Sequence, residues 1–204
     1  MDGVLTDPAA DARDWYWGHL YSDGELVVTA SSTPDASRAV VASGRLCAQG
    51  RYERIGYMAW GDDRGSVVKA AFAADLSAYD YVNLNYFFHG FSALEEVTGM
   101  ANLPGCREMR YAFASCGLTE LDLSGFDASQ CEDLFYCFAG SGLVTIWADA
   151  NFAYPEGCSG SGMFYSCDAL VGGAGTTYDF SRRNIEYFRI DGGELAPGYL
   201  TAKE

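Results

Sequence analysis

The 204-residue sequence has few of the residues on which nucleic-acid sites depend. It holds 13 lysines and arginines against 28 aspartates and glutamates, for a formal net charge of −15, and no basic cluster offsets this balance. Affinity for a phosphate backbone comes mainly from clustered Lys and Arg, so nucleic acid is a poor partner, and anionic lipid is disfavoured as well. The acidic balance alone indicates little more than solubility.

Long apolar runs are also missing. No stretch approaches the ~18–20 residues that cross a bilayer, so we expect no direct membrane insertion. Residues 1–14 lack the basic and apolar stretches of a signal peptide, and we expect them to be disordered or to derive from cloning. On these features the chain is either intracellular or trimmed of its leader. Five prolines beside 24 glycines indicate turns rather than disordered linkers.

The sequence has only two histidines, which limits catalytic and metal chemistry. A Ser or Cys nucleophile needs an adjacent base such as His, but His19 falls in a predicted hairpin and His89 in a repeat, where we expect it to face solvent. The seven cysteines contain no C-x-x-C pair, so neither a metal site nor a cofactor is predicted. No catalytic residue is predicted; a glycosidase carboxylate pair stays open only because such pairs have no sequence spacing.

An internal repeat is the main signal that is present. Four segments superimpose on the anchors Phe88, Phe113, Phe138 and Phe164, at steps of 25, 25 and 26 residues. Each anchor is followed five or six residues later by a leucine, at Leu94, Leu118, Leu143 and Leu170. A regular step of this length is typical of repeat architectures, in which one unit cannot bury its apolar face alone.

Two apolar periods alternate within each repeat. The spacing Leu118-x-x-Leu121-x-Leu123 is that of a strand, and Leu84, Phe87 and Phe88 lie at the i, i+3, i+4 positions of a helical turn. We therefore predict an α/β repeat, a right-handed leucine-rich-repeat-like solenoid with a parallel sheet and short helical or 3-10 turns. Cysteines recur at equivalent places in the repeats, so we expect buried thiols as core fillers rather than disulfides.

Both ends depart from the repeat, which predicts β-hairpin-like end caps. Trp15 to Thr29 contains the turn residues Asp23-Gly24, and residues 185–200 contain Asp191-Gly192-Gly193. The expected organisation is a start at 1–14, an N-terminal β cap at 15–60, repeats at 61–170 and a C-terminal cap at 171–204. Residues 31–58 carry the weakest pattern.

Three stretches resemble the BspA-like leucine-rich surface proteins of bacteria. They are Leu121-Asp-Leu-Ser-Gly-Phe-Asp-Ala-Ser129, Met163-Phe-Tyr-Ser-Cys-Asp-Ala-Leu-Val-Gly-Gly173, and Tyr187-Phe-Arg-Ile-Asp-Gly-Gly193 with Pro197-Gly-Tyr199. The resemblance covers about residues 60–200. It implies a cell-surface or secreted protein, with signal and anchor outside this sequence, that adheres to a protein or glycan on a host or neighbouring cell.

A binding surface is predicted on the solvent side of the sheet. If the strands stack in register, Glu96, Glu120 and Thr145 align, and so do Thr98, Asp122 and Trp147. We expect an outward tryptophan beside acids to be a hot spot for a basic or glycan-bearing partner. The alternatives are that Trp147 only packs on the next repeat or a cap, and that the chain is a structural spacer without a ligand of its own.

Overall fold

The computed structural model describes residues 15–47, 61–80 and 82–203. The chain forms short strands connected by turns and 3-10 segments, and these residues contain no α-helix. The strands are β1 (Trp15–Tyr21), β2 (Glu25–Thr29), β3 (Val40–Cys47), β4 (Lys69–Phe72), β5 (Val82–Asn83), β6 (Glu96–Thr98), β7 (Cys106–Glu108), β8 (Glu120–Asp122), β9 (Thr145–Ala148) and β10 (Leu200–Ala202). The 3-10 segments are η3 (Gly61–Ser66), η4 (Ala74–Ala78), η5 (Met100–Asn102), η6 (Phe180–Arg182), η7 (Ile185–Tyr187) and η8 (Gly193–Leu195).

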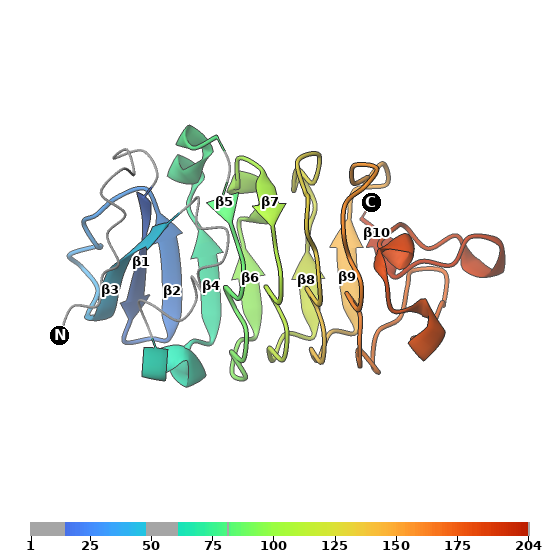
Figure 1. Ribbon diagram of the computed structural model, residues 1–204. Helices are drawn as coiled ribbons and strands as arrows, with labels where there is room; N and C mark the ends of the chain where they lie inside the picture. The colour runs from blue at the N-terminus through green and yellow to red at the C-terminus, as the bar shows by residue number, and fades with distance from the viewer. Residues whose placement is uncertain (1–14, 48–60, 81, 204) are drawn as a thin grey trace.

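The described strands belong to three separate sheets. Their orders are β3-β1-β2-β4-β6, β10-β9-β8 and β5-β7. The strands follow one another along the long axis of an elongated molecule, with β1 to β3 at one end and η6 to η8 at the other (Figure 1). None of the described helical segments exceeds six residues, far fewer than a membrane-spanning helix needs.

The predicted leucine-rich-repeat-like solenoid with one continuous parallel sheet is therefore wrong. The largest sheet combines antiparallel pairs (β1 with β2 and β3) and parallel pairs (β2 with β4, β4 with β6), and the other two sheets are small. The parallel series is interrupted between β6 and β8. Three-residue strands make few ladder bonds, so a local change in backbone path is enough to end a sheet there.

The N-terminal hairpin is confirmed, and it extends further than predicted. β1 and β2 pair antiparallel around Gly24, whose φ of +82° suits a residue without a Cβ. β3 then pairs with the other edge of β1, with Trp17 opposite Arg45, in a stretch whose sequence pattern was weak. The rest of the predicted 15–60 cap, residues 48–60, and the predicted start at 1–14 lie outside the described residues.

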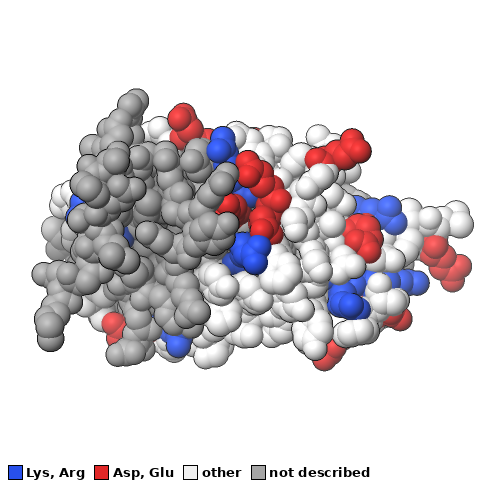
Figure 2. All heavy atoms as spheres, in the orientation of Figure 1, with Lys and Arg blue, Asp and Glu red and all other residues white. Residues whose placement is uncertain are grey.

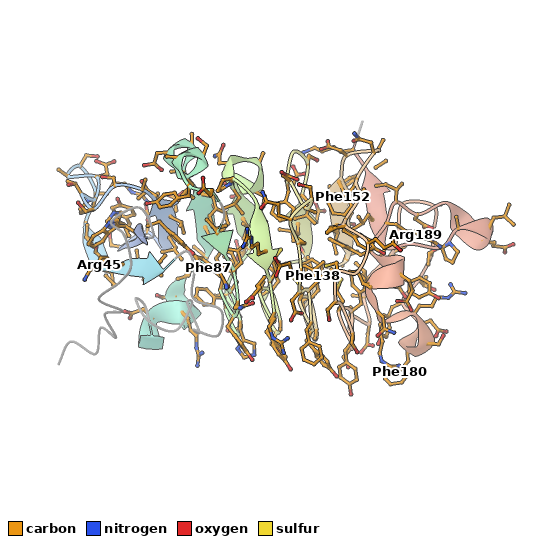
Figure 3. All side chains as sticks on the ribbon, turned by 45° about the horizontal axis from the view of Figure 1, so that its top comes forward. Arg45, Phe87, Phe138, Phe152, Phe180 and Arg189 are labelled. Carbon is orange, nitrogen blue, oxygen red and sulfur yellow. The ribbon has the colours of Figure 1, made fainter. Side chains whose placement is uncertain are left out.

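The phenylalanine anchors stack in the core as predicted. The ring centroids of Phe88 and Phe113 are 5.4 Å apart, and those of Phe113–Phe138 and Phe138–Phe164 are both 5.7 Å apart. All four rings are fully buried, as are the four repeat leucines, and Phe138 lies midway along the core (Figure 3). Burying a side chain of this size contributes roughly 1.5–3 kcal/mol, so the row accounts for much of the apolar stabilisation.

The C-terminal hairpin prediction is wrong. Residues 185–187 form the 3-10 segment η7, and β10 pairs parallel with β9, with Leu200 opposite Ile146. The chain is held there by the buried Asp191 carboxylate, which accepts hydrogen bonds from the backbone N–H groups of Ala174, Thr176 and Gly193 at 2.9 Å. One acid thereby satisfies donors from two loops, which takes the place of strand pairing.

Candidate functional site

The break between two sheets forms the candidate site. β6 and β8 are edge strands of different sheets and lie side by side, and no backbone hydrogen bond joins these two described strands. A hollow of ≈ 700 Å³ extends over the break. It is lined by Lys69, Glu95, Glu96, Val97, Thr98, Gly99, Met100, Ala101, Thr119, Glu120, Asp122, Ser124, Trp147 and Lys203.

The hollow contains most of the residues predicted from sequence. Trp147, Asp122, Glu120, Glu96 and Thr98 line it, and Thr145 does not. The predicted register holds between β8 and β9, where Glu120 is opposite Thr145 and Asp122 is opposite Trp147. The predicted alignment of β6 with β8 fails as a ladder because those two strands are not hydrogen-bonded.

Trp147 is half-buried, and one hydrogen bond orients its indole. Its strand β9 lies between β8 and β10, with Asp122 on one side and Thr201 on the other. The indole Nε1–H donates a hydrogen bond to Oε2 of Glu120 at 3.3 Å. Among the residues that the structure describes, no other ring or cation stacks on the indole, so its exposed part is open to a ligand.

Two lysines in the hollow were not predicted. The Lys203 ammonium pairs with the Asp122 carboxylate, and Lys69 Nζ lies 3.0 Å from Glu96 Oε2. Burial raises the pKa of Asp122, but hydrogen bonds from Lys203 and Ser124 more than offset this and leave the pKa below its ordinary value. The hydrogen bond to Glu96 raises the pKa of Lys69.

Glu120 is left as the strand acid best placed for an external cation. It is exposed, and within the described part of the chain its side chain bonds only to the neutral indole of Trp147. A cation held there would meet a carboxylate and an aromatic ring together. Cation–π contacts of this kind contribute about 0.5–1 kcal/mol at exposed sites and more when desolvated.

The two histidines lie outside the hollow. His19 is buried; its Nε2 donates to the Ser31 carbonyl at 3.0 Å, which leaves Nδ1 to accept from the Ser43 hydroxyl at 2.7 Å. This contact joins β1 to β3 and was not predicted. His89, predicted to face solvent, is half-buried against the rings of Tyr86 and Tyr111.

The cysteines behave as core residues. The side chains of six of them are described, all as free thiols, with Cys158 half-buried and the other five buried. Burial raises the pKa of Cys116 and Cys131 to about 12 and that of Cys158 and Cys167 to about 11. The described His, Cys, Asp and Glu side chains form no group suited to a metal ion.

Comparison of the chain with protein-family models, with curated proteins and with solved structures finds no match.

Proposed function

We propose that this chain is a non-catalytic interaction module of a bacterial surface or secreted protein, which binds a macromolecule on a host or neighbouring cell. The site is the hollow between β6 and β8, and the group it takes is a lysine or arginine side chain of a protein partner. The observation that supports this most directly is the half-buried Trp147, anchored by Glu120 at the rim of an acidic hollow.

Charge favours a cationic group over the alternatives. The chain carries a net charge of −15, and the hollow contains Glu95, Glu96, Glu120 and Asp122 against two lysines. An acidic surface raises the association rate of a basic partner and repels an anionic one. Trp and an unneutralised carboxylate together match the guanidinium of arginine, which stacks on aromatic faces and hydrogen-bonds to carboxylates.

The partner would lie across the outer face of the strands rather than extend the sheet. Cα atoms of β6 and β8 approach within 8 Å of each other. A strand inserted between them would require about 9.6 Å, which is two strand spacings of ~4.8 Å. Recognition through side chains is therefore favoured over recognition through a backbone ladder.

The proposal is tested by binding to a panel of purified cell-surface and matrix proteins. Trp147→Ala should weaken a true partner by ~2 kcal/mol or more, about 30-fold in affinity, as expected of a hot spot. Leu195→Ala is the control, because Leu195 is 99% exposed and lies outside the hollow. The thermal melting of both variants should stay near that of the wild type. Unchanged affinity of Trp147→Ala for every partner recovered would contradict the proposal.

A structural spacer without its own ligand is the second candidate. The ion pairs of Lys203 with Asp122 and of Lys69 with Glu96 favour it, because they neutralise two of the four acids that line the hollow. Under this alternative, every protein of the panel would show the same affinity for the wild type and for Trp147→Ala. Trp147→Ala would lower the melting temperature instead.

A further inference from the structure

A second ordered surface of the molecule is a row of tyrosines on the repeat segments. Tyr86, Tyr111 and Tyr136 each precede a core phenylalanine by two residues, and Tyr165 continues the row on the fourth segment. Consecutive ring centroids are 4.9, 5.4 and 5.7 Å apart, with interplanar angles of 14°, 26° and 35°. Phe180 ends the row at the lower edge of the molecule (Figure 3), with its ring 5.9 Å from that of Tyr165.

The backbone under this row is strained. Tyr86, Tyr111 and Tyr136 have φ values of 58°, 53° and 53°, in the left-handed region that residues with a Cβ avoid. The equivalent position in the fourth segment is Gly162, with φ of 63°. Glycine has no Cβ and adopts this conformation without strain. Three tyrosines thus occupy a backbone position at which glycine is free of strain, and such outliers cluster at functional sites.

The stacking determines which part of each ring a ligand can reach. Tyr111 is stacked between Tyr86 and Tyr136, so both faces of its ring are covered, whereas Tyr165 is tilted by 35° against Tyr136. A ligand therefore reaches the hydroxyl end of these side chains rather than the ring faces. Tyr111 and Tyr136 are partly exposed and Tyr165 is 40% exposed. Within the described part of the chain, the hydroxyls of these three tyrosines make no hydrogen bond. Burial and the neighbouring phenols Tyr86 and Tyr136 raise the pKa of Tyr111, so this hydroxyl stays protonated at neutral pH.

We propose that this row binds an extended, neutral, β-linked glycan that runs along it, with one sugar ring for each tyrosine. The sugar rings of such a glycan follow one another at an interval close to the 4.9 to 5.7 Å between consecutive tyrosine rings. Each phenol hydroxyl can donate one hydrogen bond to a sugar oxygen and accept one from a sugar hydroxyl. The tyrosine row therefore recognises the repeating unit of the polymer, whereas the proposed cation site at Trp147 binds a single side chain.

Charge limits the choice of polymer. The four tyrosines are uncharged; Arg110 lies near Tyr111, and Arg183 lies over the ring of Phe180. Figure 2 shows few acidic or basic residues on the lower middle of the face that it presents. The net charge of −15 disfavours polyanions such as sulfated or uronic-acid glycans. A proline-rich peptide is the other polymer that aromatic surfaces take, but its polyproline helix repeats every ~9.3 Å, which does not match the interval between consecutive rings.

The test is titration of the full chain with cello- and chito-oligosaccharides from the disaccharide to the hexasaccharide. Affinity should rise steeply to the trisaccharide, which spans Tyr111, Tyr136 and Tyr165, and little beyond the tetrasaccharide. Tyr111→Phe removes one hydroxyl but keeps the stack, and should weaken trisaccharide binding about fivefold, the equivalent of one hydrogen bond of ~1 kcal/mol. Tyr111→Phe with Tyr136→Phe should weaken it further.

Two controls separate this site from other effects. Tyr187→Phe removes a phenol hydroxyl outside the row and should leave oligosaccharide affinity unchanged. Trp147→Ala should also leave it unchanged, so that failure of the cation site and failure of the tyrosine row are distinguishable. No binding of any neutral oligosaccharide, affinity independent of chain length, wild-type affinity in the double variant, or binding of a proline-rich peptide instead would each overturn the proposal.

Discussion

The indole N–H of Trp147 on β9 and the carboxylate of Glu120 on the neighbouring strand β8 are joined by a hydrogen bond of 3.3 Å. The two residues are not direct cross-strand partners, since Trp147 is opposite Asp122. The diagonal contact turns the indole toward β8 and the break beyond it, and it places the carboxylate next to the ring. The two halves of the proposed cation site are thus coupled.

Glu120→Gln separates the charge of this residue from its hydrogen bond. The glutamine amide oxygen can still accept from the indole, so we expect a change of less than ~0.5 kcal/mol in unfolding free energy, as for other exposed positions. Binding of a basic partner should weaken, mainly through slower association, and should depend less on salt. Association rates at two salt concentrations measure this, with Asp168→Asn as an exposed-acid control. Equal loss in both variants would mean that only net charge matters.

Phe113→Ala tests the core stack. The ring is fully buried between Phe88 and Phe138, so its removal should cost ~3–5 kcal/mol through lost burial and a residual cavity. Urea unfolding should show the loss as a lower midpoint, while Leu195→Ala stays within ~0.5 kcal/mol of wild type. A Phe113→Ala midpoint equal to that of the wild type would mean that the ring does not pack as described.

The core stack was predictable because its signal is periodic. One large apolar residue recurring at steps of 25 or 26 has to stack if neighbouring segments pair, and Asp23-Gly24 between two apolar runs defines a hairpin. Sequence spacing carried no comparable signal for the break between β6 and β8. Strands of three residues have too few side chains to indicate whether their edges pair or diverge.

Features that depend on distant or unusual contacts were missed for physical reasons. Lys203 and Asp122 are 81 residues apart, and only the parallel pairing of β10 with β9 brings them together. Tyrosine recurs in the sequence at the equivalent positions Tyr86, Tyr111 and Tyr136, but a left-handed backbone conformation is not expected of tyrosine. The predicted site residues still converge in one hollow, except Thr145, because the β8–β9 register was read correctly.

Asp191 should make stability depend on acid pH. Burial alone raises its pKa, but the Thr176 side chain and the backbone N–H groups of Thr176, Gly193 and Ala174 lower the pKa below its ordinary value. A carboxyl whose pKa is lowered on folding stabilises the fold above its unfolded pKa of ~3.9, and this contribution is lost as the pH falls through the folded value. Urea unfolding should therefore be flat from pH ~7 to ~5 and decline below pH ~4.

Asp191→Asn checks that assignment. The asparagine amide cannot accept all the donors that now meet the two carboxylate oxygens, so we expect a loss of at least ~2 kcal/mol at pH 7, with a shallower decline in acid. Asp168→Asn, at an exposed position, should change stability by less than ~0.5 kcal/mol. Similar acid profiles for the wild type and Asp191→Asn would assign the acid sensitivity to other carboxyls.

The thiols should be reduced and slow to react. Thiol titration of the denatured, unreduced protein should approach all seven cysteines, because the six whose side chains are described are free. In the folded protein at pH ~8, raised pKa values keep the buried thiols protonated, and the thiolate is the reactive form. Cys158, which is half-buried with a pKa of about 11, should react before Cys116 and Cys131. Loss of the fastest phase in Cys158→Ala would identify it, and a titre near one thiol would contradict the prediction.

Lys203 neutralises part of the negative charge of the hollow, so its removal should strengthen binding of a basic partner. Its ammonium pairs with Asp122, and both side chains are about half exposed, so the ion pair contributes little to stability. Lys203→Ala should leave the unfolding free energy within ~0.5 kcal/mol of wild type while exposing a second carboxylate beside Glu120. The association rate should rise about twofold to threefold at low salt and return to the wild-type value at high salt, where charges are screened. Asp122→Asn should act in the opposite direction, because it leaves an unpaired ammonium facing the incoming cation. If Lys203→Ala slows association instead, the lysine contacts the partner directly, and the partner group in this hollow is an anion rather than a cation.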